Sequence, residues 1–303
     1  MNQNAGISTA EQRLKRRETL LAWMFLLPAL IFVVAFTFLP VVFSAIDSVV
    51  VAGSRFRPAQ IGVADNYANL LDDPVFVTAF VNNLYYGLVT IPASMGIALV
   101  MALWANAHIK GQWFLRLSFF VPTVLPMIAV ANIWLFIYTP GYGLLDQITG
   151  LFGMRPRNWL GMPDTALPAL MVVTVWKEAG FFMIFYLAAL QQMPRDLIDV
   201  ARLEGANRWS IFWRITFPLL MPTTLFVFVN ATVNAVRLVD HVIVITKSGP
   251  NHATRLLLSH LYEIAFLMWN INAAAALTIV ILAVLGLIAV CQFLMLDRRV
   301  HYK

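Results

Sequence analysis

The stretch MPRDLIDVARLEGANRWSIFWRITFPLLMPT, from Met193 to Thr223, lies between two long apolar segments and carries the most informative pattern of the chain. It is too long for a tight connection. Pro194 suits the first turn of a short helix, and Gly205 permits a sharp turn after it. A second short amphipathic helix follows from Asn207 to Ile215, and Pro218 opens the next apolar segment. The pattern predicts two short helices joined by a turn at a membrane surface.

Composition places the rest of the chain in a bilayer. Of its 303 residues, 60% are hydrophobic and only 12% are charged, and the mean hydropathy is +0.77. Soluble domains carry about 25% charged residues, so this chain has too little polar surface to face water all round. The net charge of +6 does not indicate nucleic acid, because the basic residues cluster between apolar segments. We expect membrane lipid as the surroundings and no nucleic-acid partner.

Six apolar segments are long enough to cross a bilayer, which takes about 20 residues each. They lack the alternation of barrel strands and so predict helices. The first is longer than a signal-peptide core of about 7–15 residues, and no A-x-A site follows it, so it reads as an uncleaved helix. The predicted fold class is all-α, a polytopic membrane protein with six transmembrane helices. The segments are Leu20–Phe43, Phe80–Trp104, Leu117–Tyr138, Ala166–Leu190, Pro218–Thr246 and Ile271–Leu296.

Basic residues predict the direction of the spans. Most of the 21 Lys and Arg residues fall on one side of a six-span arrangement, and the positive-inside bias places that side in the cytoplasm. Both termini are therefore expected to be cytoplasmic, with the chain in the cell membrane, which is the inner membrane if the cell is Gram-negative. The predicted order is a cytoplasmic tail at 1–19, a first helix at 20–43, an extracytoplasmic loop at 44–79, a five-helix core at 80–296 with a cytoplasmic loop at 193–217, and a cytoplasmic tail at 297–303.

Two outer connections are large enough to dock another protein. The first, at 44–79, is polar, and the second, at about 139–165, is rich in Gly and Pro. Plain connection remains the alternative. The cytoplasmic pair of short helices likewise has two readings, since it could seat in a groove on a cytoplasmic protein or only touch lipid headgroups.

The cytoplasmic stretch resembles a known family. Its spacing is similar to the E-A-A-x(3)-G-x(9)-I-x-L-P signature of permease subunits in binding-protein-dependent ATP-binding-cassette importers. Asp199, Val200 and Ala201 occupy the E-A-A positions, Glu204 stands where many members have Asp, and Phe217 stands where Leu is usual; these departures are conservative. The stretches NWLGMPDTALPALMVVTVWK and VDHVIVITKSGP, ending at Lys177 and Pro250, also resemble carbohydrate-type permeases. The chain resembles the first permease subunit of the glycerol-3-phosphate importer and, more broadly, maltose-type permeases.

The resemblance implies a type I importer transmembrane domain and a set of partners. These are a second permease subunit in a heterodimer, two ATPase subunits beneath, and an extracytoplasmic solute-binding protein above. It implies a non-catalytic subunit with no cofactor of its own, ATP and Mg being held by the ATPase chains. The chain lacks a G-x(4)-G-K-[ST] loop, which fits that division. The residues it assigns to ATPase coupling are Asp199, Ala201, Glu204, Gly205, Ala206, Ile215 and Pro218.

Polar residues inside the spans are the candidates for a solute path, because charge in a membrane is costly and faces protein or water. Spacings of four, three and four residues place Asn230, Asn234, Arg237 and His241 on one face of a continuous fifth helix. The alternative is interhelical hydrogen bonding, with Arg237 and Asp240 as a packing pair. For the neighbouring charges Lys177 and Glu178 of the fourth span, a structural role is favoured over contact with solute.

Two other classes of function were weighed. A secondary transporter could use the intramembrane charges as a relay, but we find no inverted repeat, and a relay leaves the cytoplasmic stretch unexplained. A membrane enzyme would need a nucleophile–base pair or a metal motif. The single Cys291 and the scattered histidines offer no metal-ligand spacing. A sugar, polyol or glycerol-phosphate solute rests on the resemblance alone.

Overall fold

The computed structural model describes residues 9–51, 60–62, 65–107 and 110–297. Its long elements are helices, and the strands within that part are the short antiparallel pair β1 (Val50–Val51) and β2 (Gln60–Ile61). Five helices are long and apolar enough to cross a membrane, and a bent helix pair makes a sixth span. The six-span, all-α prediction is therefore confirmed. The basic residues Arg55, Arg57, Arg298, Arg299 and Lys303, the last three in the predicted C-terminal tail, lie outside the described residues.

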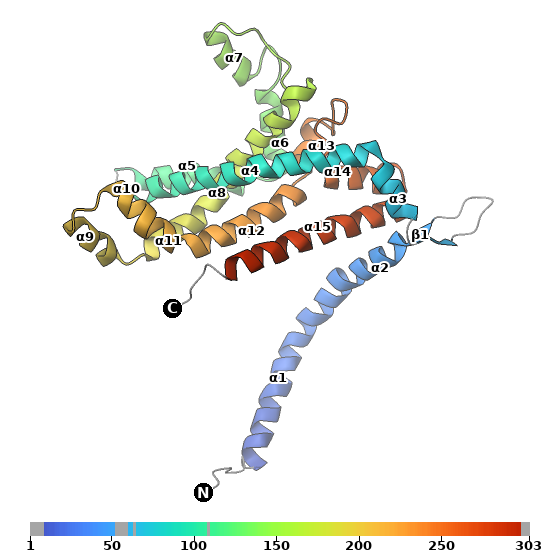
Figure 1. The fold of residues 1–303 in the computed structure, drawn as a ribbon, viewed down its shortest axis with the longest axis horizontal. Coiled ribbons are helices and arrows are strands. Elements are labelled where there is room, and N and C mark those ends of the chain that lie inside the picture. The colour runs from blue at the N-terminus through green and yellow to red at the C-terminus, as the bar shows by residue number, and fades with distance from the viewer. Residues whose placement is uncertain (1–8, 52–59, 63–64, 108–109, 298–303) are drawn as a thin grey trace.

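The first span is a long helix that stands apart from the bundle. It runs through α1 (Thr9–Val33), the π-helical turn η1 (Val34–Phe38) and α2 (Leu39–Ser48). No residue in the apolar window of this span is buried. Figure 1 shows α1 projecting away while α2 approaches α15 (Ile271–Asp297). The helix starts well before Leu20, so part of the predicted N-terminal tail is helical.

The bundle is built around α4 (Pro74–Asn106) and α8 (Pro163–Gln192), which pack together along their length. α8 is the most buried span, with 56% of its apolar window inside the protein. Small residues allow close approach between membrane helices. At Gly180 of α8, an added Cβ would lie 2.4 Å from the backbone oxygen of Phe119. α8 is thus pressed against α5 (Gln112–Val124) as well as α4.

The third span is broken in two. α5 and α6 (Met127–Ile137) meet at 102°. Pro126 lies in the gap and has no N–H to donate, so the carbonyl of Pro122 loses its helical partner. The expectation of one straight helix over Leu117–Tyr138 is wrong for this reason.

The fourth connection and the fifth span follow in several pieces. The elements in order are α9 (Arg195–Leu203), α10 (Arg208–Ile211), the π-helical η2 (Phe212–Thr216), α11 (Phe217–Leu219), α12 (Met221–Arg237) and α13 (Asp240–Ile245). Leu238 leaves the helical region with φ −78° and ψ 101°. The fifth span is therefore not the single continuous helix predicted from Pro218 to Thr246.

Short elements complete the described fold outside the long spans. They are α3 (Asp65–Asp72), α7 (Leu144–Leu151), α14 (Leu257–Tyr262) and the π-helical η3 (Glu263–Leu267). Two amides on α4 hold α14 and the segment before it against the bundle. Asn82 Nδ2 donates to the carbonyls of His252 and Arg255 in that segment. Asn83 Oδ1 accepts from the backbone N–H of Leu257, the first residue of α14. α4 itself begins earlier than Phe80, after Asp73 caps it by accepting from Val75 N at 2.8 Å.

Candidate functional site

The stretch predicted to be cytoplasmic forms two short helices around a glycine turn. α9 ends in a Schellman motif, in which Ala206 N donates to the carbonyl of Ala201 at 2.9 Å and Gly205 N to that of Arg202 at 3.0 Å. Gly205 has φ +84°, a left-handed conformation that favours glycine. Asn207 then caps α10 by accepting from Ser210 N at 2.7 Å. The helix–turn–helix geometry predicted from the sequence is present.

This coupling loop, residues 193–217, leaves large apolar side chains uncovered. Leu203 is 88% exposed and Trp209 is 71% exposed. Leu197, Val200 and Trp213 are exposed as well. Apolar side chains of this size gathered at one loop usually mark a contact surface. The loop therefore presents an apolar surface that the described part of this chain does not cover.

The remaining coupling candidates surround that surface. Asp199 is exposed and pairs with Arg202 at 3.2 Å, while Glu204 caps the C-terminal end of α9. Ala201 is buried under the turn, and Ala206 and Ile215 are half-buried. Pro218 is exposed in the first turn of α11.

Two polar contacts join the middle of α8 to the fifth span. Asn234 Nδ2 donates to Glu178 Oε2 at 2.6 Å. On the far side of the break, the fully buried His241 has its Nε2 2.9 Å from Tyr86 Oη and 3.2 Å from Thr174 Oγ1. Tyr86 and Thr174 also hydrogen-bond to each other. The predicted face of four side chains is thus divided, because Asn234 and His241 turn inward to α8.

The two charged residues at the break in the fifth span, Arg237 and Asp240, are exposed. Arg237 ends α12, Asp240 begins α13, and both are exposed on this subunit. They form no ion pair within 4 Å among the described residues, so the pairing considered from the sequence is absent there. Asn230 is half-buried and donates to the carbonyl of Phe226 in its own helix at 2.8 Å. Exposed charge inside a span is costly in lipid, so this surface must face water or another subunit.

Lys177 serves the broken third span. Its Nζ donates to the carbonyl of Leu125 at 2.6 Å and to that of Pro122 at 3.1 Å. Both carbonyls lack helical partners because of the bend at Pro126. The structural role favoured for Lys177 from the sequence has a physical basis in these two bonds.

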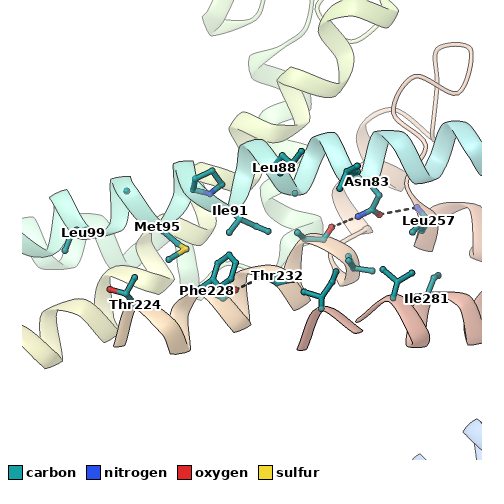
Figure 2. Close-up of a pocket in the computed structure, with 18 of the residues that line it drawn as sticks. Asn83, Leu88, Ile91, Met95, Leu99, Thr224, Phe228, Thr232, Leu257 and Ile281 are labelled. Atoms are coloured by element: carbon teal, nitrogen blue, oxygen red, sulfur yellow. Dashed lines mark hydrogen bonds between the residues drawn. The ribbon is translucent and has the colours of Figure 1, made fainter. Parts of the chain in front are cut away.

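A large groove of about 670 Å³ lies between α4, α12 and α15. Figure 2 shows Ile91, Met95 and Phe228 within it, and the amide of Asn83 at one end. Its lining is almost entirely apolar. Hydroxyl-rich or anionic solutes need donors and acceptors, so the groove suits lipid or an apolar helix better than cargo.

Two residues that contact His241, Tyr86 and Thr174, were not predicted from the sequence. Tyr86 and Thr174 carry no charge and sit in apolar runs, so nothing marked them singly. The available signal was spacing: Thr174 lies one turn before Glu178 on α8, and Tyr86 one turn after Asn82 and Asn83 on α4.

The second outer connection is folded around one carboxylate. Asp146 in α7 accepts from the backbone N–H of Gly141 at 2.8 Å, from Trp159 Nε1 at 3.1 Å and from Arg157 N at 3.4 Å. The Gly141 bond is the main reason that the pKa of Asp146 lies below its ordinary value, with the Trp159 and Arg157 bonds adding to it. This connection is an ordered element and carries exposed Leu151 and Phe152.

Comparison with known proteins agrees with this architecture. Residues 94–302 match the model of the binding-protein-dependent transport system inner membrane component family. The chain is 33% identical to the trehalose/maltose transport system permease protein MalF of Thermococcus litoralis over 80% of this chain and 82% of that protein. It is 29% identical to the sn-glycerol-3-phosphate transport system permease protein UgpA of Agrobacterium fabrum over 93% of this chain and 97% of that one.

A solved structure shares the fold. The bacterial alginate ABC transporter, crystallised in complex with its alginate pentasaccharide-bound periplasmic protein, contains a chain that superposes with a TM-score of 0.82. The match covers 95% of this chain and 96% of that one at 22% sequence identity. Taken with the coupling loop and the six spans, these matches show that the chain belongs to the binding-protein-dependent transport system inner membrane component family, the non-catalytic, multi-pass permease subunits of carbohydrate-type ATP-binding-cassette importers.

Proposed function

We propose that this subunit forms half of the translocation path for a sugar, polyol or glycerol-phosphate-type solute. In this proposal an extracytoplasmic binding protein delivers the solute, a second permease completes the path, and two ATPase subunits that bind ATP and Mg drive the cycle. Both termini are cytoplasmic.

The coupling loop is the single observation that carries the proposal. It presents exposed Leu203 and Trp209 on two short helices held by the Gly205 turn. A pair of amphipathic helices with anchors of this kind fits a groove on a partner protein. The relatives' printed names, maltose, trehalose and glycerol-3-phosphate permeases, support the solute class.

The exposed charges at the break in the fifth span support the position of the path. Arg237 offers a fixed fork of donors, and Asp240 offers two acceptor oxygens. The guanidinium matches phosphate, carboxylate or paired hydroxyls, and the carboxylate matches hydroxyls. A partner permease facing this surface would enclose them in a polar channel. The periplasmic protein bound to the alginate transporter supports a delivery partner on the outer side.

Purification of the whole complex tests the proposal. The chain, purified in mild detergent from the membranes of its own cells, is expected to co-purify with ATPase subunits. Lys110→Cys and Leu151→Cys, each in a Cys291→Ser background and both at exposed positions, should react with membrane-impermeant maleimide from opposite sides. Absence of ATPase subunits, or labelling of both cysteines from outside intact cells, would refute it.

A further inference from the structure

The two broken spans are held by the same short piece of α8. Lys177 donates to the carbonyls of Pro122 and Leu125 at the break in the third span. Glu178, the next residue, accepts from Asn234 just before the break in the fifth span. Thr174, one turn earlier, contacts His241 just after that break.

The contacts replace hydrogen bonds that the breaks remove. Pro126 cannot donate to the carbonyl of Pro122, and Lys177 supplies that bond. In the fifth span, the departure of Leu238 from helical geometry leaves the carbonyl of Ala235 without a helical donor, and Asn83 Nδ2 lies 3.4 Å from it. Backbone groups without partners in hydrocarbon cost several kcal/mol each, so the breaks depend on these side chains.

The fifth-span break is clamped from both sides. Asn234 is fixed to Glu178 three residues before Arg237, and His241 is fixed to Thr174 and Tyr86 directly after Asp240. The residues between the two clamps have little freedom to rotate. Arg237 and Asp240 therefore keep their outward direction because their neighbours on each side are anchored inward.

We propose that Thr174, Lys177 and Glu178 form one rigid frame on α8 that holds both breaks, and that Glu178 and Thr174 are positioning residues for Arg237 and Asp240. This inference rests on the proposed function, since it assigns Arg237 and Asp240 to the solute path. It goes beyond a packing role because it links the geometry of the path to a hydrogen bond on the inner side of the helix.

An exchange of partners across the Glu178–Asn234 hydrogen bond tests the proposal in the reconstituted complex with its binding protein. Asn234→Asp places two carboxylates together and should lower maximal transport about tenfold, a loss of the size expected for an interhelical bond. The double variant Glu178→Gln/Asn234→Asp restores donor and acceptor in reverse order. It should recover transport to within about twofold of the wild type. Thr278→Val is the matched control, because Thr278 bonds only to Ala274 of its own helix, and it should transport normally.

A second measurement does not depend on transport. Val239→Cys, in a Cys291→Ser background, reports the break through its rate of reaction with a water-soluble maleimide. That rate should rise at least about fivefold with Asn234→Asp and return with the double variant. The frame is refuted if the double variant still transports poorly and its Val239→Cys still reacts fast with maleimide, whether or not the complex assembles. It is also refuted if Thr278→Val loses as much transport as Asn234→Asp. Loss of ATPase co-purification from the wild-type chain would instead refute the proposed function, while the labelling result would still judge the frame.

Discussion

The turn at Gly205 gives the sharpest test of coupling. A Cβ at this position would meet no atom within 4 Å, so replacing the glycine costs backbone strain alone. An L-residue in the left-handed region costs about 1–2 kcal/mol, which is about a 5–30-fold shift in the population of the turn. Gly205→Ala should therefore weaken co-purification of the ATPase subunits and reduce transport by that factor.

Different substitutions of Gly205 separate backbone strain in the turn from lost contact with the ATPase subunits. Asparagine tolerates left-handed geometry better than other residues, so Gly205→Asn should lose clearly less than Gly205→Ala. Gly205→Arg adds bulk and charge at the docking surface and should release the ATPase subunits. Gly111, with φ +82° and open space around its Cβ, is the matched control on the same side of the membrane. If Gly111→Ala impairs coupling as much as Gly205→Ala, or if Gly205→Ala couples normally, the reasoning fails.

Three further outcomes are expected. Arg237→Gln should impair transport and shift solute preference while assembly and solute-independent ATPase activity survive; unchanged preference in uptake competition would remove Arg237 from the path. Lys177→Met should cost about 2–4 kcal/mol of stability by leaving two part-buried carbonyls unpaired, whereas Lys177→Arg should lose less. A Lys177→Met melting temperature equal to that of the wild type would contradict the bonds at the bend. Burial lowers the pKa of His260 in α14 below its usual 6.5, so the folded state resists protonation of this side chain. α14 should therefore be most stable above about pH 6.5 and should open more readily as the pH falls below it. Hydrogen exchange of α14 should show this pH dependence in the wild type and not in His260→Gln.

Hydropathy and turn chemistry accounted for much of the fold. The spans could be predicted because each needs about 20 apolar residues, and the coupling loop because Pro194, Gly205 and Asn207 punctuate it in the right order. Asn82 and Asn83 behave as the interhelical hydrogen bonders expected of amides in a span. The spans and the coupling loop depend on residues close together in the chain, whereas the partners of Asn82 and Asn83 lie more than 150 residues away.

The breaks in the spans could not be predicted in the same way. Pro126 marks the first break, yet proline is also tolerated inside membrane helices, as Pro92 in α4 shows. At the second break, Leu238 and Val239 are neither proline nor glycine, so the sequence there predicts a continuous helix. Their geometry depends on contacts from α4 and α8 that are distant in sequence, such as the 56 residues between Glu178 and Asn234. For this reason the sequence predicted one face for Asn234, Arg237 and His241, whereas in the structure Asn234 and His241 turn toward α8 and Arg237 is exposed.

The two bonds of Lys177 also set an order on how the protein is made. Leu125 precedes Lys177 by 52 residues, which a ribosome needs about 3–10 s to add at 5–20 residues per second. Until α8 enters the bilayer, the carbonyls at the bend have no donor from this frame, and the third segment is better accommodated near the insertion machinery than in lipid. The hydrogen bonds at the bend are thus completed only when a helix synthesised later joins the bundle, so the third span depends on the fourth for its final geometry.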